Sequence, residues 1–127
     1  MPIDMDPVVP EGRQLVQKYG NGRFTITTVV FEGSVIVFPE ETSPWAVQSA
    51  EDITIENLSA ITDQADDFDI VLIGAGPKFG RIPLDLRKAL KEFGLVMEWM
   101  DTGAACRTFN VLIAEERRVA AALIAVD

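Results

Sequence analysis

Three short, mainly apolar runs in the second half of the chain constrain the fold more than any other feature. They cover residues 69–73, 95–100 and 119–126, and segments with helical spacing separate them. Strands that are apolar along their length are typical of sheets covered on both faces, and helical connections favour parallel pairing. The sequence therefore predicts an α/β fold with a central mixed β-sheet and helices packed on it.

Three helices are expected around these strands. The first begins after Thr54 as N-cap and repeats apolar residues at Ile55, Leu58, Ile61 and Ala65. The second starts at Pro83 and ends at Gly94, and its predicted buried stripe is Leu86, Ala89, Leu90 and Phe93. The third has Thr102 as its predicted cap, and its predicted inner face is Ala105, Phe109, Leu112 and Ile113.

The first third of the chain has the pattern of an antiparallel β meander. β-rich runs at 15–19 and 23–28 flank Gly20-Asn21-Gly22, a strong hairpin signal. The runs 29–31 and 34–38 flank Glu32-Gly33 and predict a second hairpin, after which Pro39 and Pro44 should end the sheet. With the meander closing one side, we expect a three-layer, single domain over 1–127 that starts with an irregular tail at 1–10.

Composition excludes several classes of function. The 127 residues contain no histidine, so catalysis by a Ser-His or Cys-His pair and histidine-ligated metals are impossible within one chain. Twenty acidic and eleven basic residues give a net charge of −9, which opposes binding to nucleic acid. The single cysteine, Cys106, excludes an intrachain disulfide and fits a reducing compartment.

The location of the protein is predicted from its apolar runs. The N-terminus has neither the basic nor the apolar part of a secretory signal. The longest wholly apolar run, 119–126, has eight residues, whereas a membrane helix needs about 20. We therefore expect a soluble, cytoplasmic protein with no integral membrane segment, as a monomer or weak homo-oligomer.

The acidic residues are unevenly distributed. Residues 1–66 carry eleven acids and three bases, whereas 67–127 carry nine acids and eight bases. This asymmetry is explained either by solubility through self-repulsion or by an acidic face that selects a basic partner. The sequence leaves both explanations open.

A candidate cleft lies where two predicted strands end. If 69–73 and 96–100 are parallel neighbours, the turns after them emerge at one edge, where α/β sheets commonly bind ligands. The residues that would form a pocket for a small anion there are Gly74, Gly76, Lys78, Arg81, Asp101, Thr102, Arg107 and Asn110. The alternative is ordinary structure, in which Thr102 caps a helix, Asp101 balances Arg107 and Asn110 bonds a loop carbonyl.

Other candidate sites have simpler explanations. The glycines at 74, 76 and 80 miss the spacing of a dinucleotide-binding loop, so we predict no cofactor. Cys106 suits the side of a packed helix as a small buried hydrophobe. The acids at 63, 66, 67 and 69 fit no EF-hand spacing and indicate a solvated turn, so no metal site is expected.

Two motifs carry a family resemblance that runs from about residue 24 to the end. The first is Gly74-Ala75-Gly76 after an apolar strand, and the second, long and specific, is the run MDTGAACRTFNVL at 100–112. Glu115, Arg117 and Val119 continue the pattern. With these motifs, the chain resembles a widespread family of small domains of unknown function that includes a mitochondrial respiratory complex I assembly factor (assembly factor 3) and an adipogenesis-associated protein.

The resemblance implies a three-layer α/β fold with a mixed sheet and no established catalytic activity. The positions that match the family pattern are Gly74, Gly76, Met100, Thr102, Arg107, Thr108 and Asn110. Relatives commonly carry Tyr where this chain has Phe109, which argues against acid–base chemistry at that position. We expect a non-enzymatic protein-binding module related to complex assembly factors. Its partner is a protein whose identity the sequence does not reveal, and subunits of membrane complexes are among the candidates. The alternative is a binder of, or modest enzyme on, a small anionic metabolite at the cleft.

Overall fold

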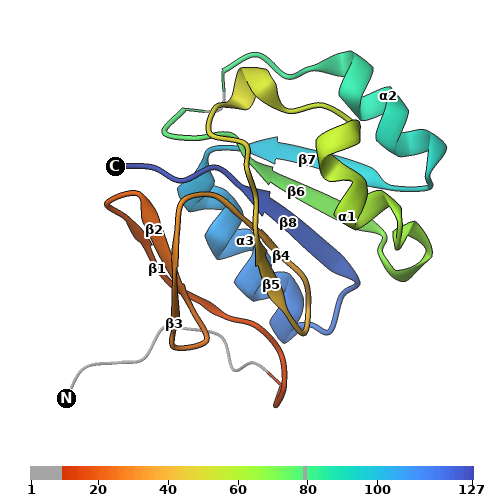
Figure 1. The fold of residues 1–127 in the computed structure, drawn as a ribbon. Coiled ribbons are helices and arrows are strands. Elements are labelled where there is room, and N and C mark those ends of the chain that lie inside the picture. Colours follow the sequence, from red (N-terminus) through yellow and green to blue (C-terminus); the bar gives the residue numbers. More distant parts are fainter. Residues whose placement is uncertain (1–9, 79) are drawn as a thin grey trace.

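The computed structural model describes residues 10–78 and 80–127, which form three layers (Figure 1). The middle layer is a five-stranded sheet with the order β5-β4-β8-β6-β7. Its strands are β4 (Val35–Val37), β5 (Thr42–Pro44), β6 (Ile70–Gly74), β7 (Val96–Met100) and β8 (Val119–Leu123). Apart from Pro10, the predicted N-terminal tail lies outside the described residues.

The central sheet is mixed, as the sequence predicts. β6 pairs in parallel with both β7 and β8, whereas β4 pairs antiparallel with β8 and β5. All five residues of β8 are buried, because it lies inside the sheet and both of its faces are covered. The mixed α/β fold is therefore confirmed.

Different elements cover the two faces of the sheet (Figure 1). One face carries α1 (Ser59–Thr62) and α2 (Leu84–Glu92), with the short 3-10 turns η1 (Ala50–Asp52), η2 (Glu56–Leu58) and η3 (Ala65–Asp67). The other carries α3 (Thr102–Ala114) and a second sheet made of β1 (Val16–Gly20), β2 (Arg23–Ile26) and β3 (Val29–Glu32). Alternate residues of β6 serve the two cores: Val71 and Ile73 face the first, and Leu72 faces the second.

The meander is confirmed, but its second turn is not where the sequence placed it. β1 and β2 form the predicted hairpin, with Asn21 and Gly22 at φ of 55° and 73°. β2 then pairs with β3 through a turn at Thr27 and Thr28, which also have positive φ. The predicted hairpin at Glu32-Gly33 is wrong, because Gly33 leads from one sheet into the other. The wholly buried β4 pairs with β8 and β5.

The predicted first helix is divided into short turns. Thr54 has the expected N-terminal role: its hydroxyl accepts from the Asn57 backbone N, and the Asn57 side-chain oxygen accepts from the Thr54 backbone N. Leu58 and Ile61 are buried, so the apolar spacing correctly predicted which side faces the core. The regular helix itself covers only Ser59–Thr62.

In α2, Leu86 and Leu90 are buried as predicted. Phe93 is 46% exposed, so its predicted place in the buried stripe is wrong. The helix ends at Glu92 and Gly94 takes φ of 81°, which turns the chain before Phe93 can continue the stripe.

The segment after β4 extends the sheet beyond its predicted end. β5 forms at the edge, with Pro44 as its last residue. Trp45 follows it and is buried, and its indole N–H donates to the Asn57 carbonyl at 2.8 Å. Trp45 therefore belongs to the core that α1 covers.

Candidate functional site

The carboxyl ends of the parallel strands meet, as the cleft hypothesis requires. Gly74 of β6 stands in register with Met100 of β7 and with Leu123 of β8. The Ala75 backbone N donates to the Met100 carbonyl at 2.8 Å, which continues the pairing beyond the strands. The turn after β6 and the start of α3 are therefore neighbours.

The buried side chain of Thr102 connects the segments that follow β6 and β8 by hydrogen bonds. Its side chain is fully buried, and its hydroxyl donates to the Ile124 carbonyl at 2.7 Å and accepts from the Gly76 N at 3.0 Å. The helix cap is Asp101, whose carboxylate accepts from the Ala104 N at 2.8 Å. The predicted capping role of Thr102 is therefore wrong by one residue, because its hydroxyl is held by the neighbouring strand ends.

The glycines of this turn have structural reasons to be glycine. A Cβ on Gly74 would lie 3.0 Å from the Thr102 Cα and 3.0 Å from the Leu123 Cδ2. Gly76 has φ of +107°, a conformation that other residues rarely adopt. Close packing and backbone conformation thus account for the motif without a bound phosphate.

Tyr19 also lies in this region, although no sequence pattern predicts it. Its phenol lies over Gly103 in the first turn of α3, where an added Cβ would overlap the Tyr19 Oη and lie 3.4 Å from the Arg107 Nη1. A hollow of about 330 Å³ lies beside them. It is lined by Tyr19, Gly76, Pro77, Asp101, Gly103, Ala125, Val126 and Asp127. Only the three-dimensional packing of the meander against α3 brings Tyr19 here.

Asn110 connects α3 to the meander. Its side-chain NH₂ donates to the Val16 carbonyl at 2.9 Å, and its side-chain oxygen accepts from the Val16 N at 2.9 Å. The side-chain amide therefore has a structural role, as in the alternative, but its partner is the backbone of strand β1 rather than a loop carbonyl.

Lys78 and Arg81 line a different hollow from Tyr19 and Asp101. This hollow has a volume of about 580 Å³ and lies between η1, the segment after β6 and the end of β7. Ala75, Trp99 and Ile124 contribute apolar surface, and Gly76 borders both hollows. Arg107 lines neither of them and lies near Gly103, so the structure does not bring the three predicted cations into one pocket.

Cys106 is buried on α3, as the sequence predicts. Burial raises the pKa of its thiol to about 12, although the nearby Arg107 guanidinium acts in the opposite direction. A thiol with this pKa stays protonated at neutral pH and does not provide a nucleophile. No cluster of three or more potential metal ligands occurs in the part of the chain that the structure describes.

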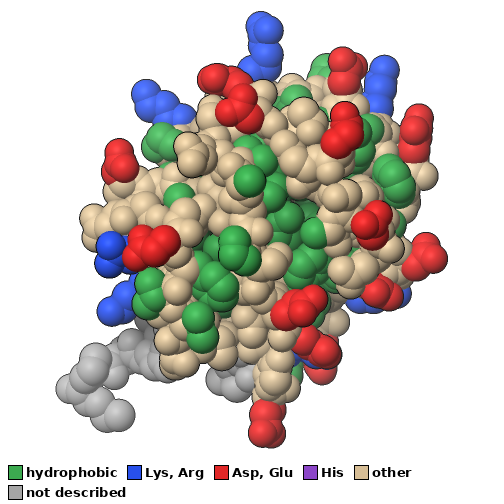
Figure 2. All heavy atoms as spheres, in the orientation of Figure 1, with side chains coloured by type: hydrophobic (Ala, Val, Ile, Leu, Met, Phe, Trp, Pro, Cys, Tyr) green, Lys and Arg blue, Asp and Glu red, His purple; other side chains and the backbone are tan. Residues whose placement is uncertain are grey.

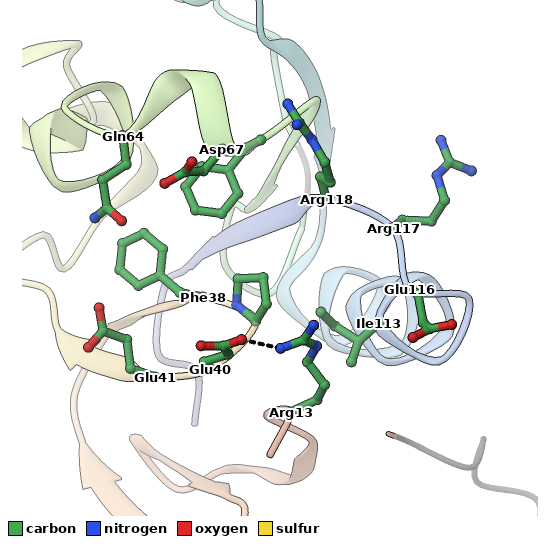
Figure 3. A pocket seen from close by; sticks show the side chains of 12 residues that line it. Arg13, Phe38, Glu40, Glu41, Gln64, Asp67, Ile113, Glu116, Arg117 and Arg118 are labelled. Atoms are coloured by element: carbon green, nitrogen blue, oxygen red, sulfur yellow. Dashed lines mark hydrogen bonds and ion pairs between the residues drawn. The ribbon is translucent and has the colours of Figure 1, made fainter. Parts of the chain in front are cut away.

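Another groove lies at the opposite, amino-terminal end of β6 and β8 (Figure 3). Its volume is about 550 Å³. The residues that line it are Arg13, Phe38, Pro39, Glu40, Glu41, Gln64, Asp67, Phe68, Ile113, Glu116, Arg117 and Arg118. We refer to it as the amino-end groove. The sequence did not predict it because its walls come from four separate segments, namely 13, 38–41, 64–68 and 113–118.

No helix within the described residues is long and apolar enough to cross a membrane. The solved structures that resemble this chain define the class of fold. A protein described as an outer membrane protein from Bartonella henselae superposes with a TM-score of 0.84 at 38% identity, covering 94% of this chain and all of that one. A Bordetella pertussis protein described as an Mth938-like domain gives 0.78 at 27% identity, covering 98% and 92%. The molecule therefore has the mixed α/β fold of Mth938-like domains.

The sequence comparisons identify the family. Residues 16–124 match the family "Protein of unknown function (DUF498/DUF598)", and the chain belongs to it. The NADH dehydrogenase [ubiquinone] 1 alpha subcomplex assembly factor 3 of Xenopus tropicalis is 33% identical over 109 residues, which are 86% of this chain. An uncharacterized protein of Rhodobacter capsulatus is 33% identical over the same share, and the match covers 82% of that protein. The match spans 60% of the length of the Xenopus factor.

Proposed function

We propose that this protein is a non-enzymatic binding module that holds other polypeptides during the assembly of a multi-subunit complex. The observation that carries the proposal is the similarity to relatives named as NADH dehydrogenase assembly factors, over 86% of this chain. Because that similarity runs through both sheets and α3, it concerns the whole fold rather than one motif. The partners expected for such a module are protein subunits, with subunits of membrane complexes among them.

The chemistry of the chain supports binding rather than catalysis. The sequence contains no histidine, and burial keeps its one thiol protonated. The hydroxyl of Thr102 and the amide of Asn110 are bonded within the fold. Within the described residues, no buried side-chain polar atom lacks a hydrogen-bond partner, so no internal group is held ready for a reacting atom.

Affinity capture of the tagged protein from gently solubilised native cells tests this proposal. Arg107→Ala is the test variant, since Arg107 is exposed beside the α3 start. Lys88→Ala on the exposed side of α2 is the matched control. We expect one defined set of proteins with the wild type and the control, and less of it with Arg107→Ala. Capture of no other protein by any of the three would contradict the proposal.

Binding of a small anionic metabolite is a second candidate function. It is favoured by the hollow of about 580 Å³ beside the carboxyl ends of β6 and β7, where Lys78 and Arg81 are accompanied by a single acid, Glu51. Amide chemical shifts recorded with inorganic phosphate and with dicarboxylates test it. Loss of the shifts in Lys78→Ala and Arg81→Ala would support the hollow, and loss in Arg107→Ala would extend the site across the glycine turn. A spectrum unchanged by every anion would contradict it.

The cytoplasmic location, the single-domain organisation and the monomeric or weakly associated state stay predictions. Cell fractionation tests the location, and limited proteolysis tests whether 1–127 forms one stable unit. Sedimentation over a range of concentrations tests the association state.

A further inference from the structure

The amino-end groove combines an apolar floor with an acidic rim. Phe38 and Phe68 pack with their ring centroids 5.7 Å apart, and Pro39 adjoins them. Figure 3 shows Phe38 between Asp67 on one side and Glu41 on the other. The groove's volume of about 550 Å³ falls within the range of pockets that bind ligands, about 300–1,000 Å³.

Two of the three arginines that line the groove already bind groups of the protein itself. Arg13 bonds the carboxylate of Glu40. Arg118 donates to the Asp66 carbonyl at 2.7 Å and lies 3.3 Å from the Asp69 Oδ1. Arg117 extends away from the floor in Figure 3.

The acids nearest the floor are not neutralised in this way. Across residues 10–78 and 80–127, no ion pair involves Glu41 or Asp67. Glu116 is a third lining acid without an ion pair, whereas Arg117 is the single lining base without one among the described residues, so the net open charge of the groove is negative.

A second hollow extends this surface along the same side of the molecule. It has a volume of about 550 Å³ and shares Gln64 and Asp67 with the first. Its lining residues are Thr62, Asp63, Gln64, Ala65, Asp66, Asp67, Glu92 and Phe93, which include four acids and no base. Phe93 is 46% exposed and offers an apolar contact at the far end. We call the two hollows together the acidic groove.

The acidic groove belongs to a wider charged margin. Figure 2 shows apolar side chains through the middle of one face, with acidic side chains along the margin that lies over α1 and the segment after it. The same asymmetry appears in the sequence, where residues 1–66 carry eleven acids and three bases. A field of this kind steers a positively charged partner toward this side.

We propose that the acidic groove docks an extended, basic segment of a partner protein in which Lys or Arg residues accompany apolar ones. The proposal rests on the proposed function and names the chemistry of the partner. The aliphatic stem of a Lys or Arg lies against Phe38 and Pro39, and its charged end reaches Glu41 and Asp67. An apolar neighbour covers Phe93. In this arrangement the acidic side chains select a partner segment that contains Lys or Arg, and the apolar floor determines where along the groove that segment binds.

The same charges disfavour other occupants. A second copy of the chain carries a net charge of −9 and would bring another acidic surface to the groove. Nucleic acids and anionic lipid surfaces are repelled for the same reason. The complementary ligand is therefore a cationic polypeptide.

Peptide titration followed by amide chemical shifts tests the groove directly. The probes are a short peptide that alternates leucine and lysine and a counterpart that alternates leucine and glutamate. We expect only the lysine peptide to shift residues 38–41, 62–68 and 92–93. Glu41→Gln with Asp67→Asn should weaken its binding about tenfold, because two charge contacts are lost. Glu32→Gln with Glu98→Gln removes the same charge from exposed positions on β3 and β7, outside the lining of the groove, and should leave the affinity within about twofold.

Two outcomes would overturn the proposal. One is a set of shifts spread over the surface or centred outside the groove, and the other is an equal loss of affinity in the test and control variants. Capture from native cells then separates this proposal from the proposed function. Partners that bind the wild type and the Glu41→Gln/Asp67→Asn variant equally would refute the groove while leaving the binding module intact. Partners absent from every variant would refute both.

Discussion

At the carboxyl ends of β6 and β7 the side chains of Asp101 and Thr102 bond the protein's own backbone, whereas at the amino ends of β6 and β8 charged side chains surround an open groove. Thr102 and Asp101 each bond backbone groups within the first end. Glu41 and Asp67 at the other end form no ion pair within the described residues. The difference shows that Asp101 and Thr102, although part of the family motif, use their polar groups to hold the fold together. Glu41 and Asp67 belong to no motif, and their charges are not paired within the described residues.

Thr102→Val tests the first region with the largest expected effect. Valine has nearly the same shape but leaves the Gly76 N–H and the Ile124 carbonyl without the hydroxyl. An unsatisfied buried group costs about 1–3 kcal/mol, so we expect the free energy of unfolding to fall by about 3 kcal/mol. Urea unfolding measures it. A decrease in the free energy of unfolding of less than about 0.5 kcal/mol would mean that the Thr102 hydroxyl does not stabilise the contact between the strand ends.

Gly74→Ala tests the close packing at the same end. The added methyl would press on the Thr102 backbone and on Leu123, which have little room to move, and overpacking of this kind costs about 1–3 kcal/mol. Gly103→Ala is the control, because its methyl meets the far end of Tyr19, a side chain that is 44% exposed and free to swing outward. Thermal unfolding should show a much larger loss for Gly74→Ala, and equal losses would contradict the packing argument.

Asn110→Leu tests the connection between α3 and the meander. The change removes two hydrogen bonds to the Val16 backbone, each worth about 0.5–1.5 kcal/mol. We expect a loss of about 1.5 kcal/mol and faster hydrogen exchange at β1 and β2. If exchange in the meander stays unchanged, the two layers are held together by apolar contacts alone.

The thiol of Cys106 makes stability depend on alkaline pH. Its pKa rises from 9.0 to about 12 on folding, so between these values the unfolded state releases a proton that the folded state keeps. The stabilisation by the protonated thiol is therefore complete well below pH 9 and is lost as the pH rises, by about 1.4 kcal/mol at pH 10. The comparison is between wild type and Cys106→Ala in urea at pH 8 and pH 10. Equal losses in both would show that other groups cause the alkaline effect.

Neutralising the acidic groove should have the smallest effect on stability. Glu41 and Asp67 are exposed and form no ion pair among the described residues. The Glu41→Gln/Asp67→Asn variant should therefore unfold within about 0.5 kcal/mol of wild type. Thermal unfolding checks this value. A large loss would mean that the groove, like the opposite end, holds the fold together.

The sequence was sufficient for the main elements because their signals are local. The run 69–73 predicted β6, and the Gly20-Asn21-Gly22 signal predicted the β1–β2 hairpin. The prediction of a hairpin at Glu32-Gly33 was wrong because strand pairing depends on burial. The wholly buried β4 pairs with β8 in the central sheet instead of with β3. The prediction also failed at Phe93, where one turn of chain moves a residue from the core to the surface.

Of the candidate site, the sequence predicted the meeting of two chain segments but not the direction of their side chains. Gly74 and Thr102 are neighbours as expected, yet the Thr102 hydroxyl turns inward to Ile124, a residue 22 positions away. Lys78 lines the hollow beside η1, whereas Arg107 lies near Gly103 and does not line that hollow. Such directions depend on packing between layers, which has no local pattern.

The sequence by itself determined the mixed α/β class, the parallel strands β6, β7 and β8 and the charge asymmetry, because periodicity and composition are properties of neighbouring residues. Tertiary structure alone decided that Tyr19 lies over Gly103 and that Phe38, Gln64 and Ile113 line one groove. These contacts join segments far apart in the chain, and they form only when both sides of the sheet are packed.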